Sequence, residues 1–293
     1  MEAPDLEVVI VSHGAEELLR RCLAALREHP PSVPHRVTVV DSGSPDRTPD
    51  MVEREFAEVR LIRRPNIGFS AANNLVLAEP GPGAHLLLNP DTEVAGGTID
   101  ASLARLRSDP RIGMVGCKLV TPTGELDHAC KRSFPTPLGA LAHFTGVGRR
   151  SGSPGRLSQY RATELGDDEP GEVDAVNGAF MLVRSEAVAE VGLLDEGYWL
   201  YMEDLDWCYR FWQRGWKVFY EPAGTALHVK GGSSGGRRAV RQEVAFHRGM
   251  GRFYRRFYAP GHAAPYNLAV YAGIGAKLAV SLAITAAARL GQR

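Results

Sequence analysis

The sequence predicts an α/β protein whose mostly parallel sheet is flanked by helices. Two observations carry this prediction. Short apolar runs alternate with segments of helical spacing from the start of the chain to about residue 90, and polar residues follow the ends of these runs. Strands that alternate with helices are typical of parallel sheets covered on both faces. Ligands bind to such sheets beyond the carboxyl ends of the strands.

Four strands and three helices are expected in this first part of the chain. Residues 6–11 form a β-branched apolar run that fits a buried parallel strand, and the leucines of 16–27 fall on one helical face. Further strands are expected at 36–40, 59–63 and 85–88, and further helices at 48–56 and 70–78. The ligand-binding edge should then hold the polar residues at or just after the strand ends, which are Ser12, Asp41, Asn66 and Asp91.

The second part of the chain has a weaker pattern. Strands are expected at 112–120, 173–184 and 217–220, and a helix at 204–214. Residues 133–171 are rich in Pro, Gly, Ser and Arg and predict a long irregular loop, of a length usual for functional lids or disordered segments. Two helical stretches follow, a basic and aromatic one at 239–257 and an apolar one at 267–288.

Composition favours a folded globular protein with no bulk affinity for nucleic acid. The 293 residues are 44% hydrophobic and 23% charged, with a formal net charge of zero. After residue 235, ten Lys and Arg residues stand against one acid, so this segment is basic. We therefore predict two units, a main domain at 1–235 and a helical extension at 236–293.

Cysteine spacing and the start of the chain favour a cytoplasmic protein. The four cysteines form no CxxC pair and no zinc pattern, which fits free thiols in a reducing compartment. The start, MEAPDLEVVIVSHG, lacks the basic region of a secretory signal, and its apolar run has only the length of a strand.

Eight short motifs occur in order along the chain: VVIVSHG, VVDSGSPDRT, RRPNIGFSAANN, LLLNPDTEV, RSFPTP, VNGAFMLVRSEAVAEVGLLDE, YMEDLDWCYR and ALHVKGGSS. Together they resemble the family-2 glycosyltransferases of the GT-A fold, and within that family the bacterial rhamnosyltransferases that act on polyprenyl-diphosphate sugars. The resemblance runs from about residue 8 to residue 235. It implies a nucleotide-diphospho-sugar donor, a Mg²⁺ or Mn²⁺ cofactor and an acceptor that is lipid-linked or a polysaccharide.

The resemblance places the nucleotide of the donor against the ends of the first two strands. Asp41 is implied to accept the ring N–H of uracil or thymine, although DSGS is also good turn chemistry. Ser12 and Gly14 are implied to contact the nucleotide after the first strand, where Gly14 is alternatively only a turn residue.

The resemblance implies that Asn66, Gly68 and Phe69 form a loop that passes below the nucleotide. Gly68 permits close approach of the backbone because glycine has no Cβ. Asn73, or its neighbour Asn74, is implied to reach the ribose or the diphosphate. Helix capping and core packing are the alternative roles for these two asparagines.

The turn Asn89-Pro90-Asp91 resembles the metal-binding motif of the family, with Asn89 in place of its first aspartate. Asp91 is implied to bind the Mg²⁺ or Mn²⁺ ion that bridges the donor phosphates, since hard oxygen ligands suit these ions. His228, just before the segment VKGGSS, resembles the histidine that completes the metal site. A purely structural histidine is the alternative.

The acidic segment EDLD is implied to hold the general base. Asp204 would take the proton of the acceptor hydroxyl as its oxygen attacks the anomeric carbon, a direct displacement that inverts the configuration. Glu203 is implied to anchor the acceptor sugar, and Asp206 to hold the loop. The alternative for all three acids is a helix N-terminus that favours negative charge.

Five further residues are candidates for sugar or phosphate contacts. Asn177 and Gly178 are implied to face the acceptor or the transferred sugar. Trp199 can stack on the acceptor sugar or pack in the core, and the same alternatives hold for Trp207. Arg132 can contact a phosphate or lie solvated at the surface.

The basic, aromatic and then apolar tail predicts peripheral attachment to an anionic membrane surface. Residues 267–288 are just long enough to span a bilayer, but Lys277 near their middle makes a span costly. A packed helix and the pairing of two copies into a homodimer are alternatives. We expect the protein at the inner face of the cell membrane.

The leading hypothesis is an inverting, metal-dependent glycosyltransferase that moves L-rhamnose from dTDP-rhamnose to a lipid-linked or polysaccharide acceptor in cell-envelope glycan synthesis. A UDP- or GDP-sugar donor stays open, as does a homologue that binds a nucleotide sugar without turnover. The loop SHGAEE after the first strand lacks the basic, Gly-rich sequence of nucleotidyl transferases and the GxGxxG of dehydrogenases.

Overall fold

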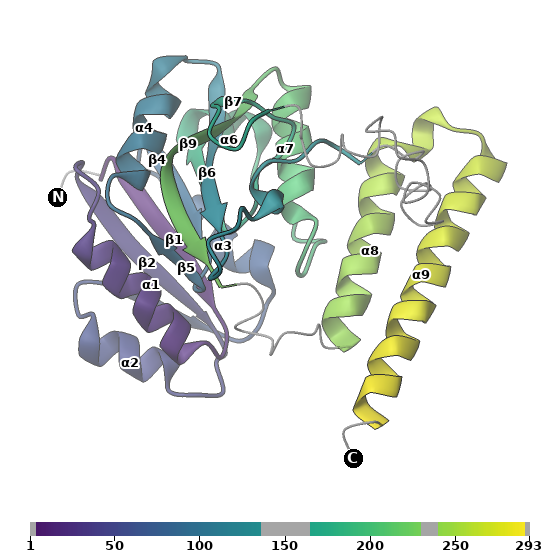
Figure 1. The fold of residues 1–293 in the computed structure, drawn as a ribbon, viewed down its shortest axis with the longest axis horizontal. Coiled ribbons are helices and arrows are strands. Elements are labelled where there is room, and N and C mark those ends of the chain that lie inside the picture. The colour runs from purple at the N-terminus through teal and green to yellow at the C-terminus, as the bar shows by residue number, and fades with distance from the viewer. Residues whose placement is uncertain (1–3, 136–164, 230–239, 291–293) are drawn as a thin grey trace.

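The computed structural model describes residues 4–135, 165–229 and 240–290 (Figure 1). Within these residues, nine strands form one mixed sheet with helices around it, and two long helices lie beside this layered body. The α/β class predicted from the sequence is confirmed. Most of the irregular loop predicted at 133–171, and the GGSS segment after His228, lie outside the described residues.

Four parallel strands form the first half of the sheet, in the order β3-β2-β1-β4. Their bounds are β1 Leu6–Ser12, β2 His35–Ser42, β3 Arg60–Arg64 and β4 Ala84–Leu88, and they alternate with the helices α1 Glu16–Glu28, α2 Thr48–Glu55 and α3 Phe69–Leu77. The sequence predicts all seven elements to within two residues at each end. The reason is that the apolar patterns are strong here, as in β4, which is a short, fully buried run.

Strands from the second half of the chain extend the sheet in mixed directions. The sheet continues from β4 with β8 Phe180–Arg184 and β6 Ile112–Val120, both antiparallel to their preceding neighbour, and with β9 Lys217–His228, parallel to β6. Two short strands pair antiparallel with β9, namely β5 Thr92–Val94 and β7 Gly171–Glu172. The remaining elements here are the helices α4 Thr98–Ser108, α6 Ser185–Val191 and α7 Glu203–Gln213, and a short 3-10 helix at His128–Cys130.

This second half departs from the sequence prediction. The strand expected at 173–184 begins only at Phe180, because Asn177 Oδ1 accepts a hydrogen bond from Ala179 N at 2.9 Å and closes a turn. The strand expected at 217–220 continues to His228, and a shift in the pairing register of β6 with β9 accommodates its extra length. The prediction also omitted β5, β7, α4 and α6.

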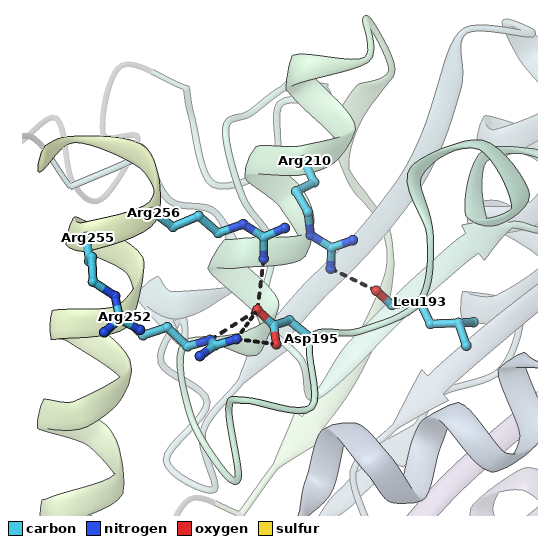
Figure 2. A pocket seen from close by; sticks show the side chains of 6 residues that line it. All are labelled: Leu193, Asp195, Arg210, Arg252, Arg255 and Arg256. Carbon is cyan, nitrogen blue, oxygen red and sulfur yellow. Dashed lines mark hydrogen bonds and ion pairs between the residues drawn. The ribbon is translucent and has the colours of Figure 1, made fainter. Parts of the chain in front are cut away.

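Helix α8 (Val240–Phe257) docks on the layered body. Phe253 is buried in the main hydrophobic core, and Arg252 and Arg256 each form an ion pair with Asp195 at 2.8 Å (Figure 2). The division of the chain predicted at residue 235 stays a prediction, since residues 230–239 lie outside the described part.

Helix α9 (Ala264–Leu290) follows a short 3-10 helix at Ala259–Gly261 and lies along the outer side of α8 (Figure 1). By length and composition its residues Ala264–Ala286 could cross a membrane, and none of their apolar window is buried. The ammonium of Lys277 lies 6.0 Å from the ring centroid of Phe246 on α8, so this charge points inward. The exposed residues of α9 are apolar, and among them Leu268, Val280 and Ile284 are exposed to 71%, 59% and 63%.

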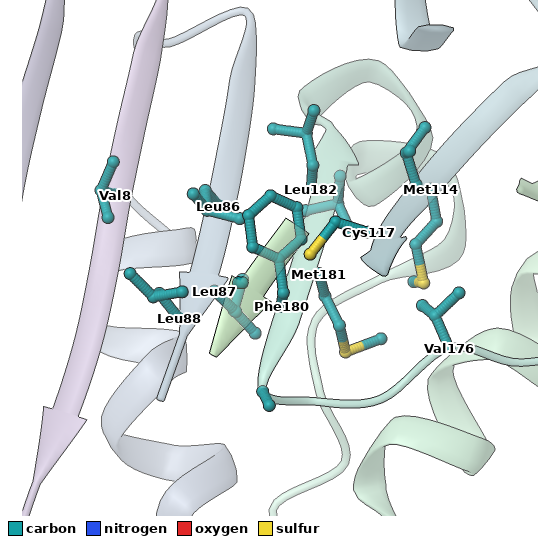
Figure 3. Close-up of a cluster of buried hydrophobic side chains, with 14 of the residues drawn as sticks. Val8, Leu86, Leu87, Leu88, Met114, Cys117, Val176, Phe180, Met181 and Leu182 are labelled. Atoms are coloured by element: carbon teal, nitrogen blue, oxygen red, sulfur yellow. The ribbon is translucent and has the colours of Figure 1, made fainter. Parts of the chain in front are cut away.

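Part of the hydrophobic core lies where β4 meets β8 (Figure 3). The apolar runs 86–88 and 180–182 lie side by side in antiparallel register, and each of the six side chains is at most 2% exposed. Where the two strands meet at their polar end, Asn89 N donates to Ala179 O at 3.1 Å. The core thereby brings the turn after β4 next to the turn before β8.

Candidate active site

Two buried oxygens mark the carboxyl edge of the first two strands. Ser12 and Asp41 are opposite each other in the register of β1 and β2. Asp41 Oδ2 accepts from Ser44 N at 3.2 Å, whereas Asp41 Oδ1 and Ser12 Oγ have no hydrogen-bond partner among the described residues. Since buried polar atoms are nearly always paired, these oxygens suit hydrogen-bond donors of a ligand. Gly14, with φ of +63°, turns the chain here and donates its N–H to Ser44 Oγ.

The loop after β3 lies against the segment that precedes α7. Phe69 N donates to Trp199 O at 2.8 Å, and Asn66 Oδ1 accepts from Gly68 N at 3.3 Å. Gly68 has a φ of +93°, and a Cβ on it would lie 2.6 Å from the ring of Trp199. The backbone at Gly68 therefore lies close to Trp199, which only a residue without a Cβ permits.

The two asparagines of α3 have different surroundings. Asn74 is fully engaged, since its amide donates to Leu194 O at 2.9 Å and its Oδ1 accepts from Leu194 N at 3.1 Å. Asn73 donates to Phe69 O at 2.9 Å, but its buried Oδ1 has no partner within the described residues. Asn74 is thus a structural residue, and Asn73 keeps the capacity to bind a ligand.

Asp91 and His228 are brought together by the pairing of β5 with β9. Thr92 pairs with His228, which places His228 Nε2 at 3.6 Å from Asp91 Oδ1. On its other side, His228 Nδ1 lies 2.9 Å from Oδ2 of the buried Asp127. Burial opposes protonation, yet the carboxylates of Asp127 and Asp91 raise the pKa of His228 to about 9.

The place between Asp91 and His228 suits a cation. If Nδ1 of His228 carries the proton that is donated to Asp127, Nε2 of a neutral His228 directs a lone pair at the carboxylate of Asp91. Nε2 and Asp91 Oδ1 then repel each other unless a proton or a metal ion lies between them. A carboxylate and an imidazole are both ligands of divalent ions. No three His, Cys, Asp or Glu side chains of the described residues form a complete metal cluster. An ion here would therefore draw further ligands from phosphate oxygens or water.

The turn at Asn177 and Gly178 connects this place with the acidic start of α7. Its Ala179 accepts from the backbone of Asn89, and a Cβ on Gly178 would lie 3.7 Å from the Cβ of Asp204. The turn thus touches the predicted metal-binding segment on one side and the predicted base on the other.

Glu203 and Asp204 begin α7 as a pair of carboxylates in different environments. Asp204 Oδ2 forms an ion pair with Arg132 at 2.5 Å, and its Oδ1 accepts from Leu205 N at 2.8 Å. Glu203 is 6% exposed, and burial together with the neighbouring Asp204 charge raises the pKa of Glu203 to about 8. Burial therefore favours the protonated form of Glu203, whereas Asp204 has a guanidinium partner in Arg132.

The interpretation of Arg132 as a solvated surface residue is wrong. Its side chain is 11% exposed and its guanidinium donates to Val176 O at 2.5 Å as well as to Asp204. A buried arginine next to a carboxylate positions that carboxylate, because breaking such a pair leaves an unpaired buried charge.

A strained turn precedes the two carboxylates. Tyr201 and Met202 have φ of 71° and 73°, a left-handed conformation that non-glycine residues seldom adopt. Helix α8 packs against this turn through Gly249, where a Cβ would lie 3.0 Å from Met202 Cγ and 3.1 Å from Tyr201 O. Asp206 secures the same segment by accepting from the hydroxyl of Tyr198 at 3.2 Å. The predicted holding role of Asp206 agrees with this geometry.

The two tryptophans have separate surroundings. Trp207 is fully buried and donates to Gly192 O at 2.9 Å, so it is a core residue and cannot stack on a sugar. Trp199 is half-buried beside the Gly68 loop, and the guanidinium of Arg241 lies 3.9 Å from its ring centroid.

The residues that sequence reasoning missed are those that hold others in place. Asp127 orients His228, and Gly249 supports the turn before Glu203. Neither lies in a motif, and their partners are 101 and about 47 residues away in sequence. Arg132 was noted, but its partner Asp204 is 72 residues away and could not be assigned. No local signal identifies such contacts.

Comparison with known proteins identifies relatives of the chain. Residues 7–153 match the family described as glycosyl transferase family 2. The chain is 32% identical over 247 residues to the N-acetylglucosaminyl-diphospho-decaprenol L-rhamnosyltransferase of Mycobacterium tuberculosis, and the alignment covers 78% of each protein. It is 25% identical over 228 residues to the rhamnosyltransferase WbbL of Escherichia coli, covering 75% of this chain and 82% of WbbL.

A solved structure with a similar fold is the mannosyltransferase PcManGT from Pyrobaculum calidifontis, in complex with GDP-Man and Mn²⁺. The TM-score is 0.59 at 16% identity, and the match covers 98% of this chain and 76% of that one. At this identity the likeness shows the fold alone, and it confirms the GT-A architecture expected from the sequence.

Proposed function

Because the chain belongs to glycosyl transferase family 2, we propose that this glycosyltransferase moves L-rhamnose from dTDP-rhamnose to a sugar carried on a polyprenyl diphosphate. Two relatives are rhamnosyltransferases by name, and the one from Mycobacterium tuberculosis is named for an N-acetylglucosaminyl-diphospho-decaprenol substrate. The acceptor is therefore lipid-linked, and the product is a precursor of a cell-envelope glycan.

The donor nucleotide binds at the carboxyl edge of the parallel strands. Asp41 Oδ1, buried and without a partner in the described chain, accepts the ring N–H of the thymine base. Ser12 Oγ and Asn73 Oδ1 offer two further unpaired oxygens for the nucleoside. The loop of Asn66, Gly68 and Phe69 closes this side of the nucleotide against Trp199.

Asp91 and His228 hold a Mg²⁺ or Mn²⁺ ion, with Asn89 offering only its neutral carbonyl from the same turn. When bound, such an ion supplies Lewis-acid stabilisation of the departing dTDP. Asp127 keeps His228 Nε2 directed at Asp91 through its hydrogen bond to Nδ1.

Asp204 is the general base on the acceptor side. It takes the proton from the acceptor hydroxyl while the hydroxyl oxygen attacks the anomeric carbon and dTDP departs, so a β-linked donor gives an α-linked product. Arg132 holds the carboxylate of Asp204 in position through their ion pair. Glu203, protonated at neutral pH, donates a hydrogen bond to the acceptor sugar, which Asn177, Gly178 and Trp199 flank.

One observation supports this assignment above the others. The turn at 177–179 contacts Asn89 through a backbone hydrogen bond of 3.1 Å and lies beside Asp204. A donor phosphate near Asn89 and Asp91 would therefore lie on one side of this turn and the base on the other. The anomeric carbon can then be reached from the side opposite the leaving group, as inversion requires.

The enzyme works at the inner face of the cell membrane, where its lipid-linked acceptor lies. The exposed residues of α9 are apolar over several turns, and the ammonium of Lys277 lies near the ring of Phe246 on α8, so α9 can lie in the membrane interface with its charge held against α8. This favours peripheral attachment.

The test has two stages. In a thermal-shift panel of dTDP-rhamnose, UDP-sugars and GDP-sugars with and without Mn²⁺, donor at roughly 100 times Kd should stabilise the protein by about 2.7 kcal/mol. We expect the largest, Mn²⁺-dependent shift with dTDP-rhamnose, followed by transfer to a polyprenyl-diphosphate N-acetylglucosamine acceptor. Preference for a UDP- or GDP-sugar would overturn the donor, and a shift unaffected by Mn²⁺ would overturn the metal role.

A further inference from the structure

A pocket rich in arginine lies between α8 and the segment that precedes α7 (Figure 2). We name it the arginine pocket. Its volume is about 610 Å³, and its lining residues are Leu193, Asp195, Arg210, Arg252, Arg255 and Arg256. They come from α7, α8 and the connection between α6 and α7, so only the folded chain assembles this site.

Positive charge exceeds negative charge in the arginine pocket. Asp195 pairs with Arg252 and Arg256, both at 2.8 Å. The fully buried Asp206 behind them pairs with Arg210 at 2.7 Å and with Arg256 at 3.1 Å. The four guanidinium groups of the pocket thus share two carboxylates, and two positive charges are left uncompensated.

Arg255 is the arginine of this pocket that is available to a ligand. Its side chain is exposed, and within the described chain it makes no hydrogen bond or ion pair. Figure 2 shows it close to Arg252, without a dashed line to any residue drawn. Neighbouring guanidinium groups repel one another unless an anion lies between them, and their planar N–H donors match the oxygens of a phosphate group.

The location of the arginine pocket indicates the source of that phosphate. The helix α8 that forms one wall also carries α9, through Tyr254, whose hydroxyl donates to Asn267 Oδ1 at 2.5 Å and whose ring contacts Tyr271. The arginines and the exposed apolar face of α9 therefore belong to one helical hairpin. Basic groups next to an apolar face are the combination that binds anionic membrane surfaces.

We propose that the arginine pocket binds the phosphate of an anionic phospholipid headgroup while exposed apolar residues of α9 lie in the membrane interface. The inference rests on the membrane attachment proposed above and adds a defined site to it. Since Asp206 and Arg210 of the pocket belong to α7, a bound headgroup fixes how the helix that begins at Glu203 is oriented toward the membrane.

The test compares two exposed arginines of α8 in the full-length protein. Arg255→Gln removes a charge from the arginine pocket, and Arg248→Gln removes the same charge from the same helix outside it. Binding is measured by flotation with vesicles of pure phosphatidylcholine and of phosphatidylcholine with phosphatidylglycerol. We expect Arg255→Gln to weaken partition onto the anionic vesicles about tenfold, and Arg248→Gln by no more than about threefold. Partition onto neutral vesicles should not change.

A change of opposite sign provides a second variant. Asp195→Asn removes one of the two carboxylates and should strengthen binding to anionic vesicles, because it increases the excess positive charge. Circular dichroism would first verify that this variant is folded.

Three results would count against the proposal. Equal losses for Arg255→Gln and Arg248→Gln would show unspecific electrostatic attraction and overturn the site, while the membrane attachment would stand. Competition by millimolar inorganic phosphate in solution, without any difference between the two variants on vesicles, would indicate a soluble phosphate ligand instead. Failure of the unmodified protein to bind either vesicle would overturn the attachment itself, and transfer to a soluble acceptor would then test the catalytic proposal separately.

Discussion

The two sides of the candidate active site are built in different ways. The donor side consists of Ser12, Asp41, Asn73, Asp91 and His228. Except for Asn73 on α3, its residues stand at or next to strand ends, where backbone pairing determines their neighbours, as in the register that sets Ser12 opposite Asp41. The acceptor side consists of Glu203, Asp204 and Arg132. Its carboxylates follow a strained turn that side chains from distant elements hold in place.

This difference indicates where each side is vulnerable. A strand end is held by many hydrogen bonds of the sheet, so single changes that touch no donor-side residue should leave the donor side intact. The acceptor side depends on a few contacts from α8 and from the segment after β6. Changes there should impair transfer while donor binding remains normal, and the variants Asp204→Asn and Gly249→Ala below test that separation.

The largest effect is expected for Asp204→Asn. Loss of the general base should reduce the rate of transfer by about 10²–10⁴-fold, because an amide cannot accept the proton of the acceptor hydroxyl. Donor affinity, measured by calorimetry with dTDP-rhamnose and Mn²⁺, should stay the same. The control Asp168→Asn changes a carboxylate whose side chain is 83% exposed and should leave both quantities unaltered. Full activity of Asp204→Asn would refute the base assignment.

A smaller effect, confined to the donor side, is expected for Asp127→Asn. Without the carboxylate on Nδ1, His228 loses its fixed orientation, and Mn²⁺ affinity should fall about 10–100-fold. Electron paramagnetic resonance of free Mn²⁺ measures this without any turnover. In a His228→Gln background the same change should have no further effect, since Asp127 acts through the histidine. An additional loss in that background would show that Asp127 contributes in another way.

A still smaller effect is expected for Gly249→Ala on the acceptor side. The added methyl would press on Met202 and Tyr201 and displace the turn before Glu203, so transfer should slow about tenfold with donor affinity unchanged. Gly251→Ala is the matched control, because it lies on the same helix with no atom within 4 Å of its added Cβ. That control should stabilise the protein by about 0.5–1 kcal/mol without slowing transfer. Equal kinetics for the two variants would contradict the support role of α8.

The smallest effect concerns pH. Because the pKa of Glu203 is raised from 4.5 to about 8 in the folded protein, the stability that this group contributes is fully present below pH 4.5 and is lost as pH rises to about 8. The Tm of Glu203→Gln should therefore fall less between pH 5 and pH 8 than the Tm of the unmodified protein. Each 1 kcal/mol of stability corresponds to roughly 2–4 °C in Tm. His228, whose pKa is raised to about 9, adds a loss of the same sign at higher pH in both proteins.

The control for the pH prediction is Glu186→Gln, at an exposed position of α6. It should follow the unmodified protein at every pH. An identical pH dependence for Glu203→Gln and this control would mean that Glu203 does not hold its proton in the fold.

The donor side was largely predictable because its information is local. Asp41 and Asp91 each follow an apolar run that can only be a buried strand, and parallel strand ends share one edge of a sheet. Sequence motifs also placed Glu203 and Asp204 at a helix start. The roles assigned to all these residues remain predictions, since no ligand has been observed with them.

The interpretations that failed depended on contacts between distant segments. Arg132 looked like a surface residue because charged side chains usually are, and only its pairing with Asp204 explains its burial. The strand expected at 173–184 contains a turn because the side chain of Asn177 accepts a hydrogen bond from the backbone N–H of Ala179. The surrounding apolar residues would fit a strand equally well.

The sequence by itself determined the family, the α/β class and the order of elements up to β4, because hydrophobic periodicity and short motifs are properties of neighbouring residues. Only the tertiary structure decided which groups hold the reactive ones: Asp127 behind His228, Arg132 on Asp204, and α8 against the turn before Glu203. It also decided that the ammonium of Lys277 lies near Phe246 of α8. The physical reason is that burial and charge pairing depend on distance in space, and residues some 50 to 100 positions apart meet only when the whole sheet is assembled.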